Sequence, residues 1–233
     1  GVYRRGHSVD HRRPDLVLCF HVVLDLGHAC GVSRGGRVTL AGFLRLAVNT
    51  VTAPRDVARL LMAMNLPSQA LWLAFALVIV LNTLMFSASL MLVPADDMFG
   101  PVLANPTVFG AMLAVSVAAL IVAVTLCGRP LGGRASYAQI AILVIWLQAL
   151  RVLLQAVVAI VGPMSLFLSG VLISAGSVLG IWIFVNFIDV AHETGSLLRA
   201  GLVLLLAVVG MMLGLSLIFS LLGVSTGGIP GYV

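Results

Sequence analysis

The chain has 233 residues, of which 61% are hydrophobic and 9% charged, and its mean hydropathy is +1.16. A soluble domain carries about 25% charged residues, so this composition excludes a water-soluble globule, a disordered chain, a disulfide scaffold and a coiled coil. The formal net charge is +5, and every basic residue is an arginine. Binding to nucleic acid is one explanation of such charge, but in so apolar a chain membrane topology and anionic lipid headgroups explain it better.

Residues 1–37 differ from the rest of the chain because they are rich in Gly, Arg and His and have little helical periodicity. We interpret them as a poorly ordered extension to a domain that begins near Val38. A signal peptide is a second interpretation, although His21 and Asp25 interrupt its apolar core. A zinc site is a third, although paired ligands of structural zinc normally stand two to four residues apart. The possible ligands here form two pairs with one-residue spacing, which are Cys19 with His21 and His28 with Cys30.

Residues 38–70 have the pattern of an amphipathic helix with one break. Apolar residues recur at helical spacing over 43–51 and again over 57–64, while Arg55, Asp56 and Arg59 occupy the other side. The break falls at Ala53-Pro54, where proline suits the first turn of a second helix. We expect this cytoplasmic segment either to lie in the membrane interface or to pack beneath the membrane domain, and the pattern leaves both arrangements open.

Residues 71–224 form the predicted membrane domain. A spanning helix needs about 20 mostly apolar residues, because unpaired backbone groups are costly in hydrocarbon. Five stretches meet this requirement, and they cover residues 71–93, 107–127, 137–161, 165–188 and 197–222. Val161-Gly162-Pro163 predicts a tight turn that makes the third and fourth spans an antiparallel hairpin. The sequence therefore predicts an all-α, five-span bundle, followed by a flexible tail at 225–233.

The arginines predict the orientation of this domain, because basic residues are enriched in cytoplasmic loops. The loop after the first span contains Asp96 and Asp97 and no basic residue. All connections that carry arginine fall on the opposite side, with Arg55 and Arg59 before the first span, Arg129 and Arg134 after the second, and Arg199 after the fourth. The N-terminus is therefore predicted to be cytoplasmic and the C-terminus to lie outside.

The third span carries three polar residues on one helical face, because their spacing is i, i+3 and i+7: Gln148, Arg151 and Gln155. Arg151 lies about 20 Å from the start of the span, which places it in the outer half of the bilayer. Its expected partners are Asp96 and Asp97 or the outer lipid phosphates. The face could be a polar seam for a substrate or a lipid headgroup, or it could order the bundle, and both interpretations remain open.

The end of the fourth span carries a second candidate site. Asp189, His192 and Glu193 stand at i, i+3 and i+4, so a continuing helix would present them together at the cytoplasmic surface. With Arg199 they form a candidate interaction cluster that could bind a partner or a cation, and a solvated helix end is the alternative. Hydrogen bonds between helices are predicted for three further polar residues, Asn82, Thr83 and Asn186.

Two small-residue motifs permit close contact between helices, either within one chain or between copies. They are Gly176 with Gly180 in the fourth span and Gly210 with Gly214 in the fifth. The chain contains no nucleophile elbow, His-Glu-x-x-His motif, phosphate loop or haem-attachment sequence. We therefore predict that the protein is not an enzyme and holds no cofactor or metal ion.

Three parts of the chain carry motifs at the ends of the spans. They are Ala53-Pro54-Arg55 with Leu71-Trp72, Leu131-Gly132-Gly133-Arg134-Ala135-Ser136-Tyr137, and the run 186–192. Together with five closely spaced spans, these motifs resemble the bacterial branch of the Yip family, the Rab-interacting membrane proteins. The resemblance covers about 38–224 and implies the same five-span fold. It supplies no active-site residues.

The resemblance also implies a function. Eukaryotic members of the family are implicated in membrane trafficking, membrane shaping and the binding of prenylated Rab proteins, but a bacterium has no Rab system. We therefore expect a multi-pass protein of the cell inner membrane that organises membrane or binds other membrane proteins or itself, with lipid as its surroundings and no nucleic-acid partner. The alternative is a small transporter, channel or lipid-translocating protein that uses the Gln148, Arg151 and Gln155 face.

Overall fold

The computed structural model describes residues 40–92 and 105–221. The N-terminal extension with its possible zinc ligands, the loop with Asp96 and Asp97, and the tail at 225–233 lie outside these residues. The described residues divide into two compact units, residues 40–52 and the described residues from 53 onward. Every described element is a helix, which confirms the predicted all-α fold for this part of the chain.

The amphipathic segment is broken where its proline predicts. In the first unit, α2 (Leu40–Thr52) ends just before Ala53, whose φ of −135° and ψ of 64° are not helical. In the second unit, α3 (Pro54–Ala63) begins with Pro54, and Asp56 lies in its first turn, where a negative charge complements the helix dipole. The missing amide hydrogen of proline thus falls at a position that has no helical acceptor.

The five predicted spans are confirmed as five helices that are long and apolar enough to cross a membrane. They are α4 (Ser68–Leu92), α6 (Pro106–Gly128), α7 (Tyr137–Val161), α8 (Leu166–His192) and α9 (Leu197–Leu221). Large apolar side chains cover their outer surfaces, and Leu73, Phe167 and Leu198 are each at least 75% exposed. Such a surface is unfavourable in water and favourable in lipid. A short 3-10 turn, η1 (Arg129–Leu131), follows α6.

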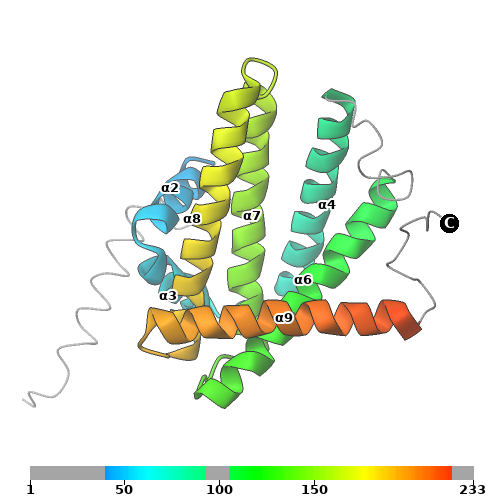
Figure 1. Ribbon diagram of the computed structural model, residues 1–233. Helices are drawn as coiled ribbons and strands as arrows, with labels where there is room; N and C mark the ends of the chain where they lie inside the picture. The colour runs from blue at the N-terminus through cyan, green and yellow to red at the C-terminus, as the bar shows by residue number, and fades with distance from the viewer. Residues whose placement is uncertain (1–39, 93–104, 222–233) are drawn as a thin grey trace, which may run out of the picture. The chain divides into compact units, whose positions relative to one another are not determined.

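The predicted hairpin of the third and fourth spans is confirmed. The helices α7 and α8 lie side by side and are joined by the turn that contains Gly162 (Figure 1). A Cβ atom at Gly176 of α8 would overlap the side chain of Leu154 of α7, so this glycine permits the close approach. The other three glycines of the small-residue motifs, Gly180, Gly210 and Gly214, face open space within the described part of the chain.

The helices α4, α6 and α9 pack around this hairpin, and they do not all run in the same direction. The helix α4 contacts α6 and α7, and Phe86 of α4 stacks on Phe109 of α6 with ring centroids 3.8 Å apart. The helix α9 contacts α6 and α8, yet it runs across the direction of α7 and α8 instead of alongside them (Figure 1). The prediction of a fifth apolar helix is therefore confirmed, but its crossing direction was not anticipated.

The buried core lies where one end of α8 meets the ends of α6 and α7 and the start of α9. Residues of all four helices are almost fully buried there, namely Val124, Ile140, Leu143, Phe187, Ile188, Ala200 and Val203. The short helix α3 packs against α7 and α8 and buries Pro54, Val57, Ala58 and Leu61. The helix α3 therefore packs on the membrane domain, while its position in the membrane interface stays a prediction. Its docking creates the polar contacts described next.

Candidate functional site

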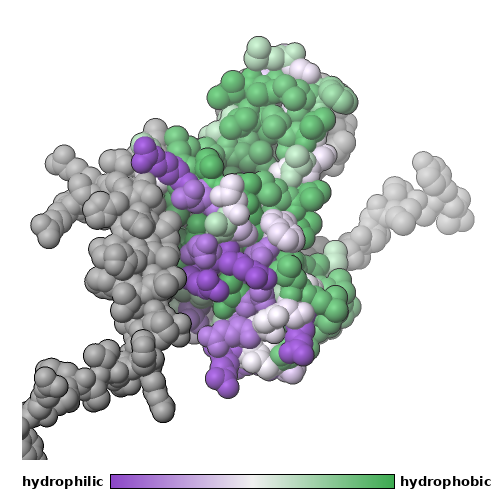
Figure 2. Space-filling view, turned by 90° about the vertical axis from the view of Figure 1, so that its left-hand side faces the viewer, coloured by the Kyte–Doolittle hydropathy of each residue, from purple (hydrophilic) through white to green (hydrophobic). Residues whose placement is uncertain are grey.

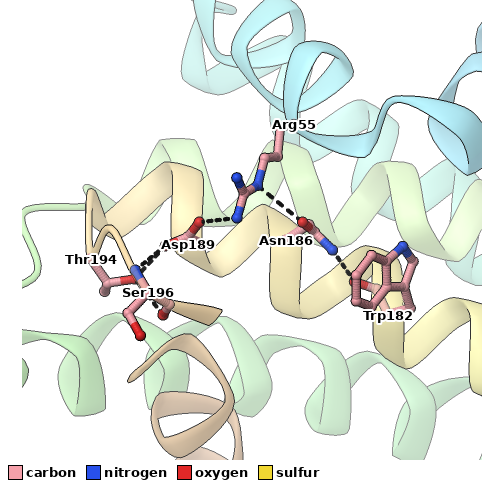
Figure 3. A network of polar contacts seen from close by, with 6 residues as sticks. All are labelled: Arg55, Trp182, Asn186, Asp189, Thr194 and Ser196. Atoms are coloured by element: carbon pink, nitrogen blue, oxygen red, sulfur yellow. Dashed lines mark hydrogen bonds and ion pairs between the residues drawn. The ribbon is translucent and has the colours of Figure 1, made fainter. Parts of the chain in front are cut away.

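A polar network joins α3 to α8 (Figure 3). Asn186 and Asp189 stand three residues apart on α8, so their side chains share the face on which α3 docks. Arg55, at the second position of α3, donates from Nε to Asn186 Oδ1 at 3.1 Å and from Nη2 to Asp189 Oδ2 at 2.9 Å. One guanidinium therefore holds two positions of α8 at once, which its planar set of donors makes possible.

Asp189 also holds the turn between α8 and α9. Its second oxygen, Oδ1, accepts a hydrogen bond from Thr194 Oγ1 at 2.6 Å and another from the backbone N–H of Ser196 at 3.1 Å. Two residues of the turn have a left-handed backbone conformation, Glu193 with φ of 54° and Gly195 with φ of 63°. Because both carboxylate oxygens already accept hydrogen bonds, Asp189 is suited to structure and poorly suited to act as a base or a metal ligand.

The ion pair is unequally buried. The side chain of Asp189 is 8% exposed, whereas that of Arg55 is 47% exposed. If Asp189 were removed, the guanidinium could still reach water. If Arg55 were removed, the carboxylate would lose its charged donor but would keep the hydrogen bonds from Thr194 and Ser196. Asn186 contributes further order, because its Nδ2 donates to the backbone oxygen of Trp182 at 2.8 Å and this bond orients its Oδ1 toward Arg55.

His192 packs against the connection between α6 and α7 at the same end of the molecule. Its side chain is 1% exposed, and neither ring nitrogen has a hydrogen-bond partner among the described residues. A Cβ atom at Gly128 or at Gly133 would overlap the imidazole ring, so both glycines are required for the contact. The backbone N–H of Gly133 donates to the oxygen of Gly128 at 2.9 Å and closes the connection against the ring. The imidazole thus acts as a packing element between α8 and the α6–α7 connection.

These contacts bring together the three motifs that stand far apart in the sequence. Arg55 belongs to the first motif, Gly133 to the second, and Asn186, Asp189 and His192 to the third. Sequence reasoning placed Arg55 on the solvent side of its helix and overlooked Gly128, Thr194 and Ser196. The i, i+3 spacing of Asn186 and Asp189 was the one available signal of a shared docking face.

For two members of the candidate interaction cluster, Asp189 and His192, the predicted surface position is wrong, while a binding role for Glu193 and Arg199 stays a prediction. Asp189 is 7% exposed and His192 is 1% exposed, while Glu193 and Arg199 are exposed. The physical reason is that α3 covers the carboxylate and the α6–α7 connection covers the imidazole. The helix also ends at His192, and the left-handed conformation of Glu193 turns the chain away from the helical face.

Among the residues that the structure describes, the predicted hydrogen bonds between helices are found for Asn186 and not for Asn82 or Thr83. Asn82 Nδ2 donates to the oxygen of Val78 at 2.7 Å, and Thr83 Oγ1 donates to the oxygen of Ile79 at 2.9 Å. Both bonds lie within α4, where the carbonyl four residues earlier is the nearest acceptor. Thr83 nevertheless contributes to packing, because a Cβ atom at Gly110 of α6 would come within 2.9 Å of its Oγ1.

The polar face of α7, formed by Gln148, Arg151 and Gln155, has a different environment from the α3–α8 polar network. Arg151 is exposed and forms no ion pair with any residue that the structure describes, and Asp96 and Asp97 lie outside that part. Gln148 is half-buried, and Oε1 of Gln155 is buried without a hydrogen-bond partner among the same residues. An apolar groove runs along α8 from Phe167 to Trp182, and none of these three α7 residues lines it.

These features define a polytopic, all-helical membrane protein whose polar contacts are concentrated at one end. The family model of the Yip1 domain matches residues 48–218, which is more than half of the chain. The chain therefore belongs to the Yip1 domain family, and the matched region contains all three motifs. No curated protein and no solved structure shows a significant match to the chain.

Proposed function

We propose that this protein is a non-enzymatic scaffold that organises membrane or binds other membrane proteins through one polar end. The observation that supports this proposal is the double contact of Arg55 with Asn186 and Asp189. A buried polar contact of this kind specifies one geometry for α3 on α8, which is a use of polar groups well suited to presenting a surface. The carboxylate has its acceptors occupied, which supports a structural role over a catalytic one.

The proposed binding surface consists of exposed charged residues around this contact. Asp56 and Arg59 project from α3, and Glu193 and Arg199 flank the turn after α8. Mixed charges on a rigid support favour recognition of a partner with complementary charge. We call these four residues the charged rim.

We further propose that this end faces the cytoplasm of a bacterial cell and that the protein resides in the inner membrane. The support is the distribution of arginine, because Arg129 and Arg134 lie on the α6–α7 connection and Arg199 lies in the first turn of α9, all at this end. The described turn at the opposite end, residues 161–165, carries no charge. Basic residues are retained on the cytoplasmic side during insertion.

The test is proximity labelling and affinity purification from the native membrane, with charge reversals on the rim. Arg59→Glu combined with Arg199→Glu should remove partners that the wild type retains, because both side chains are exposed and their reversal leaves the fold intact. Arg151→Gln serves as a control on the spanning region. Identical partner sets for wild type and rim variant would contradict the proposal.

A second candidate function is movement of a lipid or small solute along α7. It is supported by Arg151, which is exposed within a span, and by Gln155, whose buried Oε1 has no partner in the described ranges. Polar groups at this depth are costly and often mark a pathway. Reconstituted vesicles test it, because flux of a fluorescent lipid that is abolished by Arg151→Leu and unaffected by the rim variant would favour this function over the scaffold.

A further inference from the structure

We propose that the corner formed by the α6–α7 connection and the start of α9 binds the phosphate groups of anionic lipids. The corner contains three exposed arginines: Arg129 in η1, Arg134 in the following loop, and Arg199 in the first turn of α9. None of them forms an ion pair with a residue in the described ranges 40–92 and 105–221. Arginine is well matched to phosphate because its donors can bind two oxygens at once.

The first argument concerns charge compensation. The other charged residues at this end are mostly used within the protein, since Asp189 pairs with Arg55 and Asp56 pairs with Arg59 at 3.4 Å. Among the described residues, Glu193 is the remaining acid at this end, against three arginines in the corner, and it forms no ion pair with any of them. The corner therefore carries an uncompensated positive charge, and a mobile anion that can approach it from outside the protein would be attracted.

The second argument concerns position along the membrane normal. On the face shown in Figure 2, hydrophobic residues cover the upper part and hydrophilic residues gather mostly in the lower half. The corner lies where the apolar helices end, at residues 128 and 197. Tyr137 begins α7 at the same level, is 45% exposed, and has the Arg129 guanidinium 5.7 Å from its ring centroid. An aromatic ring beside a cation at the end of a span is typical of the headgroup level of a bilayer.

The third argument concerns preorganisation. Arg129 and Arg134 lie on either side of Gly133 in the sequence. The buried ring of His192 packs against Gly133 and so holds the α6–α7 connection against α8. Arg199 follows the turn that Asp189 stabilises, and α9 contacts both α6 and α8. The three side chains therefore project from a connection and a helix start whose backbones are held in place, which lowers the entropic cost of binding a headgroup.

Native mass spectrometry of the full-length protein tests this inference. The protein is released from micelles that contain equal amounts of phosphatidylglycerol and phosphatidylcholine, and the two bound lipids are counted. The wild type should retain more phosphatidylglycerol than phosphatidylcholine, and this preference should weaken as the salt concentration is raised. Each arginine near an anionic surface is worth roughly a fivefold change in binding, so Arg129→Gln combined with Arg134→Gln should reduce the preference at least tenfold.

A charge-matched variant controls for net charge. Arg45→Gln combined with Arg59→Gln also removes two exposed arginines, but they belong to α2 and α3 and not to the corner, so this variant should keep the wild-type preference. Both double variants should unfold at the wild-type temperature in neutral lipid, because the altered side chains are exposed. Equal lipid preference in all three proteins would overturn the inference, as would a corner variant that loses a protein partner while its lipid preference stays unchanged. Equal losses of preference in both double variants would also overturn it, because net charge alone would then explain the binding.

Discussion

The imidazole ring of His192 occupies the space where a Cβ atom of Gly128 would stand, so residues 64 positions apart in the sequence share one packing site. The contact explains why a histidine can end an apolar helix without reaching the surface. A glycine on the α6 side supplies the room, and the turn after Asp189 keeps the end of α8 in place. The α6–α7 connection and the α8–α9 turn are thereby held together at one end of the molecule.

Gly128→Ala should destabilise the protein by about 1–3 kcal/mol, because the new methyl group overlaps a buried ring that has no space to retreat. Thermal unfolding in detergent measures the effect. The double variant Gly128→Ala with His192→Ala should lose less stability than the two single changes together predict, since removing the ring removes the overlap. Strictly additive losses would contradict the contact.

Asp189→Ala should cost more stability than Arg55→Ala. Removal of the carboxylate deprives Arg55, Thr194 and the Ser196 N–H of an acceptor, which we expect to cost about 2–3 kcal/mol. Removal of Arg55, which is 47% exposed, should cost about 1 kcal/mol, because solvent screens the ion pair and Asp189 keeps its other two donors. The comparison is made by denaturant unfolding of both variants.

Arg59→Ala provides the control for that comparison. Its pair with Asp56 is a surface contact between side chains that are 69% and 56% exposed. Such pairs contribute little to stability, so the midpoint should stay close to that of the wild type. If Arg59→Ala destabilised the protein as much as Asp189→Ala, the assignment of the α3–α8 contacts would be wrong.

Gly176→Ala should loosen the α7–α8 hairpin, because a Cβ atom at this position meets the side chain of Leu154. We expect a lower unfolding temperature, which the second change Leu154→Ala should partly restore. The matched control is Gly180→Ala on the same helix, where a Cβ atom meets nothing within 4 Å. Alanine favours helix over glycine, so this control should be neutral or stabilising.

Gly210→Ala combined with Gly214→Ala tests whether the small-residue motif in α9 supports packing within one chain or contact between copies. Neither glycine is in contact with another described part of the chain at its Cβ position, so stability in dilute detergent should not fall. The measurement is unfolding temperature together with mass by light scattering. A loss of stability without a change in mass would contradict the open surface found at these positions.

The predicted topology is tested with reporter fusions at the two ends. If five helices cross the bilayer and arginine loops stay inside, a fusion at residue 38 should be cytoplasmic and a fusion at the C-terminus should be outside. The crossing direction of α9 makes the second fusion the informative one. A C-terminal reporter on the cytoplasmic side would show that α9 does not span.

Much of the architecture could be predicted from the sequence, because lipid imposes simple rules on it. Apolar length identified the five spans, and Pro54 identified the break between α2 and α3. Asn186 was predicted to form a hydrogen bond to another helix, and it accepts one from Arg55 of α3. Spacing alone could not show which neighbour would cover this end of α8, so Asp189 and His192 were predicted at the surface and are buried.

The amino-acid sequence by itself determined that this chain folds as apolar helices in a membrane, and it placed the ends of the five spans to within four residues. Backbone hydrogen bonding in hydrocarbon is a local requirement, and local patterns record it. Only the tertiary structure decided that Arg55 meets Asp189, that His192 lies against Gly128, and that α9 crosses its neighbours. Such pairings depend on the shapes and distances of surfaces far apart in the chain, which periodicity and composition do not encode.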